Sequence, residues 1–253
     1  MTVRIITGDC RDVMKSLTTA SVDLVLSDTP YGVTACAWDK CVDGWLDELP
    51  RIMKPSASLW CFGSMRFFME RSSDFAKWKY AQDLIWEKHN GSNGFADRFR
   101  RVHEHVVQFY RGKWRDVYKN PVHSDDATAR CVRRKQKAQH WSKIEPGNFI
   151  SVDGGPRLMR SVICARSMHG RAIHPTQKPE ALLAPIIEYS CPQGGVILDC
   201  FGGSGSTGVV AESMGRNAIL IEKDRKMAMA SCRHLNAQAP LFNSSVVAVE
   251  SAA

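Results

Sequence analysis

The sequence lacks the features that mark membrane proteins, secreted proteins and proteins stabilised by a structural metal ion. No apolar run approaches the roughly 18 residues of a membrane span, and the N-terminus lacks the apolar region of a signal peptide. The nine cysteines are scattered without a C-x-x-C pair, which argues against a structural zinc site or a disulfide framework. We therefore expect a soluble cytoplasmic protein whose 253 residues form one domain, or one domain with a large insertion.

Positive charge is concentrated in one central segment. Residues 98–143 contain 13 Lys and Arg against 4 Asp and Glu, a net charge of +9, whereas the rest of the chain has a net charge of −1. Aromatic residues such as Trp114, Tyr118 and Trp141 are interleaved with the basic ones. This mixture is typical of a surface that binds nucleic acid, although a basic stretch can also be an ordinary solvated face.

The apolar pattern alternates between short β-branched runs and helical segments. Strands are expected at residues 3–7, 22–27, 58–62, 80–87, 104–110, 195–199 and 218–222. Helices are expected at residues 10–18, 45–53, 64–77, 178–189, 207–214 and 223–236. The alternation predicts an α/β fold with a doubly wound, mostly parallel sheet. Residues 111–171 show no sustained periodicity, and the tail from residue 237 is expected to fray.

A glycine-rich loop at residues 199–208 lies between an expected strand and an expected helix. Gly203, Gly205 and Gly208 fit the pattern G-x-G-x-x-G, and Glu222 ends the next strand. Such glycines let the backbone turn tightly and let a ligand approach, and an acid at the next strand tip can bind a ribose diol. The loop is not a phosphate-cradling P-loop because no lysine follows its last glycine.

The glycine loop alone leaves two kinds of cofactor open, a dinucleotide and a nucleoside such as S-adenosylmethionine. Asp199 and Phe201, just before the glycines, favour the nucleoside. A pyrophosphate would gain nothing from a nearby carboxylate, whereas the ammonium group of a methionine moiety would. An ordinary tight turn without a ligand is the remaining alternative.

A second polar loop follows the expected strand at residues 22–27. Asp28, Thr29, Pro30 and Tyr31 stand at the carboxyl end of that strand, where open α/β sheets place their ligand crevice. A carboxylate, a backbone carbonyl and an aromatic ring suit a planar exocyclic amine, which would donate two N–H groups and stack its ring. The alternative is a polar turn with a half-buried tyrosine.

Three motifs resemble those of the S-adenosylmethionine-dependent DNA amino-methyltransferases, and they follow one another along the chain as in that family. Residues 28–31 resemble the family motif D-P-P-Y, and residues 201–205 resemble the cofactor motif F-x-G-x-G. Residues 174–179 match the block H-P-T-Q-K-P that precedes the cofactor motif in the β-group. The resemblance covers about residues 3–110 and 172–236. One departure is Thr29 in place of the first proline, which keeps the backbone carbonyl that the motif uses but loses some stiffness.

The resemblance implies a Rossmann-like methyltransferase fold in permuted order and S-adenosyl-L-methionine as cofactor. Residues 1–110 would form the catalytic half and residues 172–236 the cofactor-binding half, with residues 237–253 as a tail. The residues expected to act on the target amine are Asp28, Thr29, Pro30 and Tyr31. The residues expected to bind the cofactor are Asp9, Cys10, Thr176, Lys178, Asp199, Phe201, Gly203, Gly205, Thr207 and Glu222.

The resemblance also makes residues 111–171 a target-recognition insertion. Its Arg133, Arg134, Lys135 and Lys137, here called the basic quartet, are expected to contact DNA phosphates. Duplex DNA is the expected partner, with the target base flipped out of the stack. N6 of adenine is the favoured acceptor, and N4 of cytosine is the alternative. A monomer and a homodimer are both open.

Other readings share only part of these motifs. An RNA or protein-glutamine methyltransferase usually carries the cofactor motif first, and a dehydrogenase would share only the glycine loop. A catalytically silent DNA-binding relative would share the basic segment and would explain Thr29. Methylation of a cytosine ring carbon usually needs a Pro-Cys dipeptide, which the chain lacks. No metal site is expected, because His89, His103 and His105 have no Cys or carboxylate pattern beside them.

Overall fold

A computed structural model describes residues 1–32, 36, 39–92, 97–135, 147–168, 177–238 and 245–251. The chain divides into two units. The first comprises Met1–Asn120 with Ser161–Ala253, and the second is Pro121–Arg160. The expected insertion at 111–171 contains the second unit, while its two ends belong to the first.

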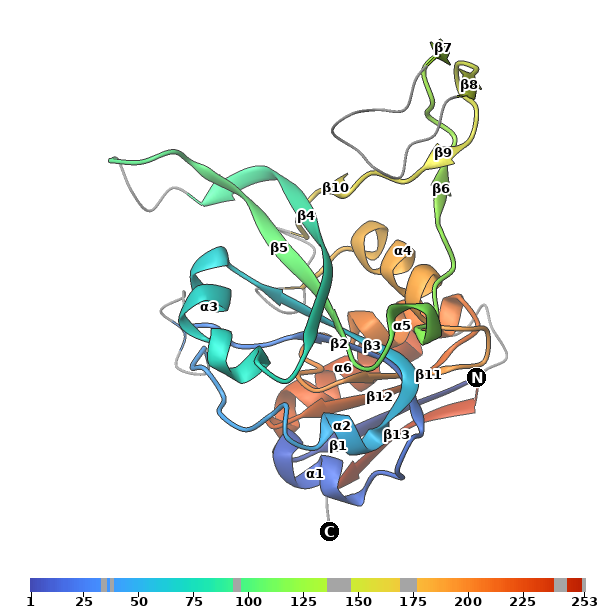
Figure 1. The fold of residues 1–253 in the computed structure, drawn as a ribbon. Coiled ribbons are helices and arrows are strands. Elements are labelled where there is room, and N and C mark those ends of the chain that lie inside the picture. The colour runs from blue at the N-terminus through green and yellow to red at the C-terminus, as the bar shows by residue number, and fades with distance from the viewer. Residues whose placement is uncertain are drawn as a thin grey trace. The chain divides into compact units, whose positions relative to one another are not determined.

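The first unit is built on a sheet whose nine described strands follow the order β10-β4-β5-β3-β2-β11-β12-β1-β13 (Figure 1). The strands are β1 (Thr2–Thr7), β2 (Val22–Asp28), β3 (Met53–Gly63), β4 (Lys79–Ser92), β5 (Arg101–Tyr110), β10 (Val162–Cys164), β11 (Val196–Asp199), β12 (Asn217–Glu222) and β13 (Ser245–Ser251). Every neighbouring pair is parallel except the two that involve β5. The predicted mostly parallel α/β sheet is confirmed.

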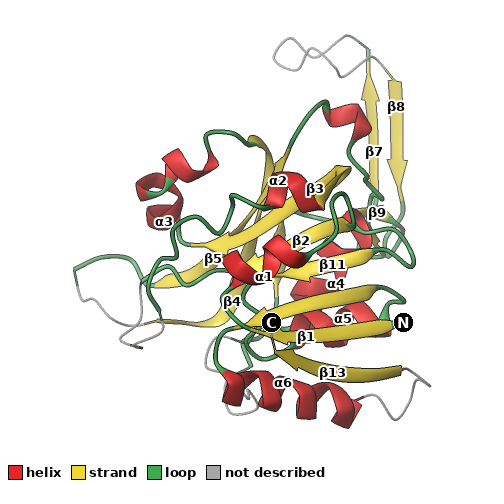
Figure 2. Ribbon diagram, turned by 90° about the horizontal axis from the view of Figure 1, so that it is seen from below, coloured by secondary structure: helices red, strands yellow, loops and turns green. Residues whose placement is uncertain are grey.

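Helices cover both faces of this sheet. They are α1 (Cys10–Ser16), α2 (Leu49–Ile52), α3 (Met65–Glu70), α4 (Glu180–Ser190), α5 (Ser206–Ser213) and α6 (Arg225–Gln238), with short 3-10 turns at Ser72–Phe75 and Trp114–Asp116. In Figure 2, α1 and α2 lie in front of the central strands, and α4 and α5 lie behind them. Among the described residues, no helix has the length and apolar character that a membrane span requires.

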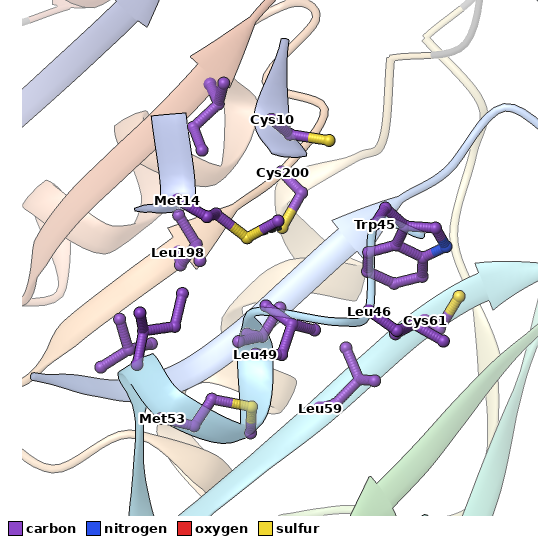
Figure 3. Packing of buried hydrophobic residues seen from close by; sticks show 14 of the residues in the cluster. Cys10, Met14, Trp45, Leu46, Leu49, Met53, Leu59, Cys61, Leu198 and Cys200 are labelled. Atoms are coloured by element: carbon purple, nitrogen blue, oxygen red, sulfur yellow. Dashed lines mark hydrogen bonds between the residues drawn. The ribbon is translucent and has the colours of Figure 1, made fainter. Parts of the chain in front are cut away.

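The central strands are apolar on both faces because both faces are covered. Val25, Leu59 and Leu198 belong to a core cluster that also includes Met14 and Leu49 from the helices α1 and α2. Figure 3 shows this cluster. On the other face, the indole N–H of the buried Trp60 donates to Ser190 Oγ of α4 at 2.7 Å.

Sulfur fills part of the core. In Figure 3, Met14 and Cys200 point toward each other, and their sulfur atoms are 3.8 Å apart. Cys10 and Cys61 are buried nearby, and burial raises the pKa of the Cys10 thiol to about 11. These buried cysteines therefore act as small apolar side chains in the core.

Three expected elements differ in the structure. The expected helix at 45–53 is reduced to α2, and β3 begins at Met53, ahead of Pro55. The expected helix at 64–77 ends at Glu70 and is followed by the 3-10 turn. The expectation of a frayed tail is wrong for Ser245–Ser251, which pairs in parallel with β1 as β13.

The second unit contains two small two-stranded antiparallel sheets among its described residues. β6 (His123–Ser124) pairs with β9 (Arg157–Leu158), and β7 (Arg130–Arg134) pairs with β8 (Gly147–Ser151). An ion pair between Asp126 and Arg157 ties the first of them. Because most of its strand residues are exposed, this unit has little core of its own.

Candidate active site

A cavity of about 760 Å³ opens at the carboxyl ends of β1, β2, β11 and β12 in the first unit. Parallel strands bring their carboxyl ends to one edge of a sheet, so loops far apart in the sequence meet there. The predicted site residues that line the cavity are Asp9, Cys10, Asp28, Thr29, Pro30, Tyr31, Lys178, Asp199, Phe201, Gly203, Thr207 and Glu222.

Asp28, the last residue of β2, has two inequivalent carboxylate oxygens. Oδ2 accepts a hydrogen bond of 2.6 Å from Nζ of Lys178. Oδ1 is buried and has no hydrogen-bond partner among the described residues. Burial raises the pKa of Asp28, and the ammonium of Lys178 opposes this. The site thus holds one occupied and one unused acceptor atom on the same side chain.

Lys178 is buried at 7% exposure, yet it stays charged. Burial alone would lower its pKa, but the carboxylates of Asp28 and Glu104 raise it. Nζ lies 3.4 Å from Oε2 of Glu104 and stands over the rings of Phe62 at 5.1 Å and Trp86 at 5.7 Å. This ammonium is therefore directed at the Asp28 carboxylate; Lys178 also lines the cavity, and its expected contact with the cofactor stays a prediction.

Glu104 on β5 was missed by the sequence analysis. It is 6% exposed, and its other oxygen accepts from the ammonium of Lys88 on β4. Burial would raise the pKa of Glu104, but the two lysines lower it to about 2. The available signal was a carboxylate in register with the apolar Val102 and Val106 of the strand, because an acid is almost never buried without a partner.

Asp39 is a second residue that the sequence analysis missed. Its Oδ1 accepts from the backbone N–H groups of Tyr31 and Gly32, each at 2.9 Å, and it is 6% exposed. These bonds fix the loop after β2, in which Thr29 is 3% exposed. The Tyr31 ring packs against Phe67 with centroids 5.9 Å apart, and burial raises the pKa of its hydroxyl.

The glycine-rich loop is organised by Asp199, the last residue of β11. Its Oδ1 accepts from the N–H of Phe201 at 3.1 Å, and its Oδ2 accepts from Thr207 Oγ1 at 2.7 Å. Burial nevertheless raises the pKa of Asp199 to about 7. Gly203 has φ +48°, a region that favours glycine, and its N–H donates to Oε2 of Glu222 at 2.9 Å.

Asp9 lines the cavity from the loop between β1 and α1. It caps α1 by accepting from the N–H of Arg11, and its carboxylate also binds the guanidinium of Arg11 and the ammonium of Lys223. These cations hold the pKa of Asp9 well below its usual range. The carboxylate therefore stays ionised and able to accept further hydrogen bonds.

Six of the predicted residues lie away from the cavity or outside the described residues. Gly205 does not line the cavity, but it begins α5 with φ +78°. Arg133 and Arg134 belong to β7 of the second unit, and Lys135 follows them. Thr176 and Lys137 lie outside the described residues. Within the described ranges, no cluster of His, Cys, Asp and Glu could hold a metal ion.

Comparison with known sequences finds a protein family and curated relatives. A family model described as DNA methylase, of the N6/N4 type, matches residues 22–231. The Type II methyltransferase M.HinfI of Haemophilus influenzae is 30% identical over 256 aligned positions, which cover 88% of this chain. The chain spans 65% of the length of that relative.

Solved structures share the fold. The M1.HpyAVI–SAM complex superposes with a TM-score of 0.62 at 21% identity, covering 93% of this chain and 100% of that one. The cytosine-N4-specific PvuII DNA methyltransferase superposes with a TM-score of 0.66 at 15% identity, covering 97% of this chain and 89% of that one. At such identities the likeness concerns the arrangement of strands and helices.

Proposed function

Because this chain belongs to the N6/N4 DNA methylase family, we propose that it transfers a methyl group from S-adenosyl-L-methionine to an exocyclic amine of a base in DNA. The observation that carries the proposal is the unused Oδ1 of Asp28, a buried acceptor in the same cavity as the glycine-rich loop. A buried acceptor without a partner is costly, and a ligand N–H would satisfy it.

The cavity suits the cofactor in size and in chemistry. Gly203 contributes bare backbone to the wall, where an added Cβ would have only the carbonyl of Phe201 nearby, at 3.7 Å. Glu222 would accept from the ribose hydroxyls, and Asp9 would accept from the adenine amine. Asp199 would face the ammonium of the methionine part. The bound sulfonium supplies an electrophilic methyl group, so the protein's work falls on the acceptor amine.

The loop after β2 would prepare that amine. An exocyclic amine is a poor nucleophile because its lone pair is conjugated with the ring. Hydrogen bonds from its two N–H groups to Asp28 Oδ1 and to the carbonyl of Thr29 would favour a pyramidal nitrogen with its lone pair free. These bonds strengthen as positive charge develops on nitrogen, so they stabilise the transition state more than the ground state. Pro30 keeps the loop extended, and Tyr31 offers a stacking surface.

We propose adenine N6 as the acceptor because the motif begins with aspartate, whereas cytosine members of the family more often begin with serine. Cytosine N4 is the alternative, and both amines present the same two N–H donors. An RNA substrate is a weaker candidate. A catalytically silent DNA-binding protein is also a weaker candidate, because Thr29 retains the backbone carbonyl that the motif needs.

We propose that the second unit holds the DNA. In the β7–β8 hairpin, Arg133 pairs with Asn148 and Arg130 pairs with Ser151, and the two arginines are exposed. The basic quartet would neutralise phosphates and orient the enzyme without reading sequence. The target base would flip out of the duplex to reach Asp28.

Incubation with radiolabelled S-adenosylmethionine and duplexes whose only candidate amine is adenine or cytosine tests this function. We expect label in the adenine duplex. The variant Asp28→Ala should bind the cofactor almost normally and turn over at least about 100-fold more slowly, as loss of an acceptor for developing charge commonly does. Transfer to RNA alone, or no transfer by the wild type to any nucleic acid, would refute the proposal.

A further inference from the structure

Asp28 begins a chain of four charged side chains, two buried and two half-buried, that the proposed chemistry does not by itself require. The order of contacts is Asp28, Lys178, Glu104 and Lys88, with two carboxylates and two ammonium groups alternating. Lys178 and Glu104 are 7% and 6% exposed. Burying even one charge is expensive unless it is paired, so an alternating row of four is unlike an ordinary surface salt bridge.

The arrangement makes Lys178 a shared cation. Its Nζ lies 2.6 Å from Asp28 Oδ2 and 3.4 Å from Glu104 Oε2, and the faces of Phe62 and Trp86 border it. Trp86 is itself fixed, because its indole N–H donates to the carbonyl of Ala165 at 2.9 Å. Glu104 and the rings of Phe62 and Trp86 therefore fix the ammonium next to Oδ2 of Asp28.

Glu104 also acts on Asp28 through space. The two carboxylate oxygens that bind the same ammonium are at most 6.0 Å apart. Like charges at this separation disfavour ionisation and make each carboxylate more basic. A more basic carboxylate is a stronger acceptor for the amine N–H. The ammonium of Lys88 opposes this rise in the basicity of Asp28. Asp199 and Tyr31, which line the same cavity, also interact electrostatically with Asp28.

We propose that Glu104 is a positioning residue for methyl transfer: it draws the ammonium of Lys178 away from Asp28 Oδ1, so that this oxygen stays open and basic for the target amine. The proposal rests on the function proposed above. Without the charge of Glu104, the ammonium of Lys178 would lose a carboxylate that holds it away from Oδ1, and it would compete with the amine for that oxygen.

The test is a titration of the Asp28 carboxyl by carbon-13 NMR in protein labelled at aspartate, with Asp28→Asn to assign the signal. In Glu104→Gln, which keeps the shape and removes the charge, the titration midpoint of Asp28 should fall by about 1 pH unit. In Lys88→Met, which removes a cation from the far end of the chain, the midpoint should rise. Glu87→Gln removes an exposed carboxylate from the same sheet and should leave the midpoint unchanged.

Kinetics supply the second readout. In Glu104→Gln, kcat should fall about tenfold, its acid limb should move to lower pH, and KM for the cofactor should stay unchanged. A midpoint that stays in place or rises in Glu104→Gln, or that falls in Lys88→Met, would overturn the proposal. So would a kcat equal to that of Glu87→Gln. The titration needs no turnover, so it decides the role of Glu104 even if the wild type proves unable to methylate DNA.

Discussion

The protonation of Asp199 should control how tightly the cofactor binds. This carboxyl is 5% exposed, and burial raises its pKa to about 7, well above the ordinary value of 3.8. Below pH 7 it is mostly neutral, and a neutral carboxyl cannot attract the ammonium of the cofactor. Binding should therefore favour the ionised form and release a proton, so affinity should rise with pH until the group is fully ionised.

The size of the effect follows from the pKa. At pH 6, about one molecule in eleven carries the ionised carboxylate, so the dissociation constant should be about tenfold larger than its limiting value. Isothermal titration with S-adenosylhomocysteine between pH 5.5 and 7.5, in buffers of different ionisation enthalpy, measures both the affinity and the released proton. Over this range the amine of the ligand keeps most of its charge.

Two variants make the reasoning refutable. Asp199→Asn should bind about 10- to 100-fold more weakly at pH 7.5, because a charge-assisted hydrogen bond is lost, and should show no pH dependence. Thr207→Val removes a donor that lies 2.7 Å from the carboxylate and stabilises its ionised form, so the inflection should move to higher pH. A wild-type affinity that is equal at pH 6 and pH 7.5, or an inflection that persists in Asp199→Asn, would contradict this account.

Two further predictions concern the cofactor loop and the second unit. Gly203→Val should abolish the thermal stabilisation by S-adenosylhomocysteine, because the φ of +48° at Gly203 and its position in the cavity wall both disfavour a branched side chain. The control Gly194→Val, at φ +71° outside the cavity, should lower the melting temperature but keep the ligand-induced shift. Replacement of the basic quartet by alanine should reduce the salt slope of DNA binding by up to roughly 3–4 units at about 0.9 per phosphate, with cofactor binding intact; an unchanged slope would make the quartet a solvated face.

The convergence of the motifs could be predicted from the sequence because it depends on local signals. Asp28, Asp199 and Glu222 each end a short apolar run that is recognisable as a strand. Once parallel pairing is assumed, these ends must meet at one edge, and the structure places all three around one cavity. Each strand is largely buried, so it contains a short apolar run that is easy to find.

Asp39 could not be assigned because its partners are two backbone N–H groups of its own loop, whose conformation no local pattern specifies. Glu104 could not be assigned because its partner is set by pairing between distant strands. Glu104 meets Lys178 only because β5 lies antiparallel beside β3 and β4, a register that the local pattern does not contain. The start of β3 was predicted wrongly because it, too, depends on pairing with another strand. Its register against β2 shifts between the pair Val22–Met53 and the pair Leu24–Ser58, so Pro55 lies where the ladder is interrupted.

The neighbours of β1 govern how the chain can reach this structure. β1 lies between β12 and β13, so Val3 pairs with Ala218 and Thr7 with Ser251. A chain emerging from the ribosome would thus leave both edges of its first strand open until almost the whole sequence has been made. Closing such long loops is slow, and open strand edges invite pairing with other molecules. The β12–β1–β13 side of the sheet can therefore pair only after residues 217–251 have been made, and we expect a nascent chain halted in the second unit to be prone to aggregate.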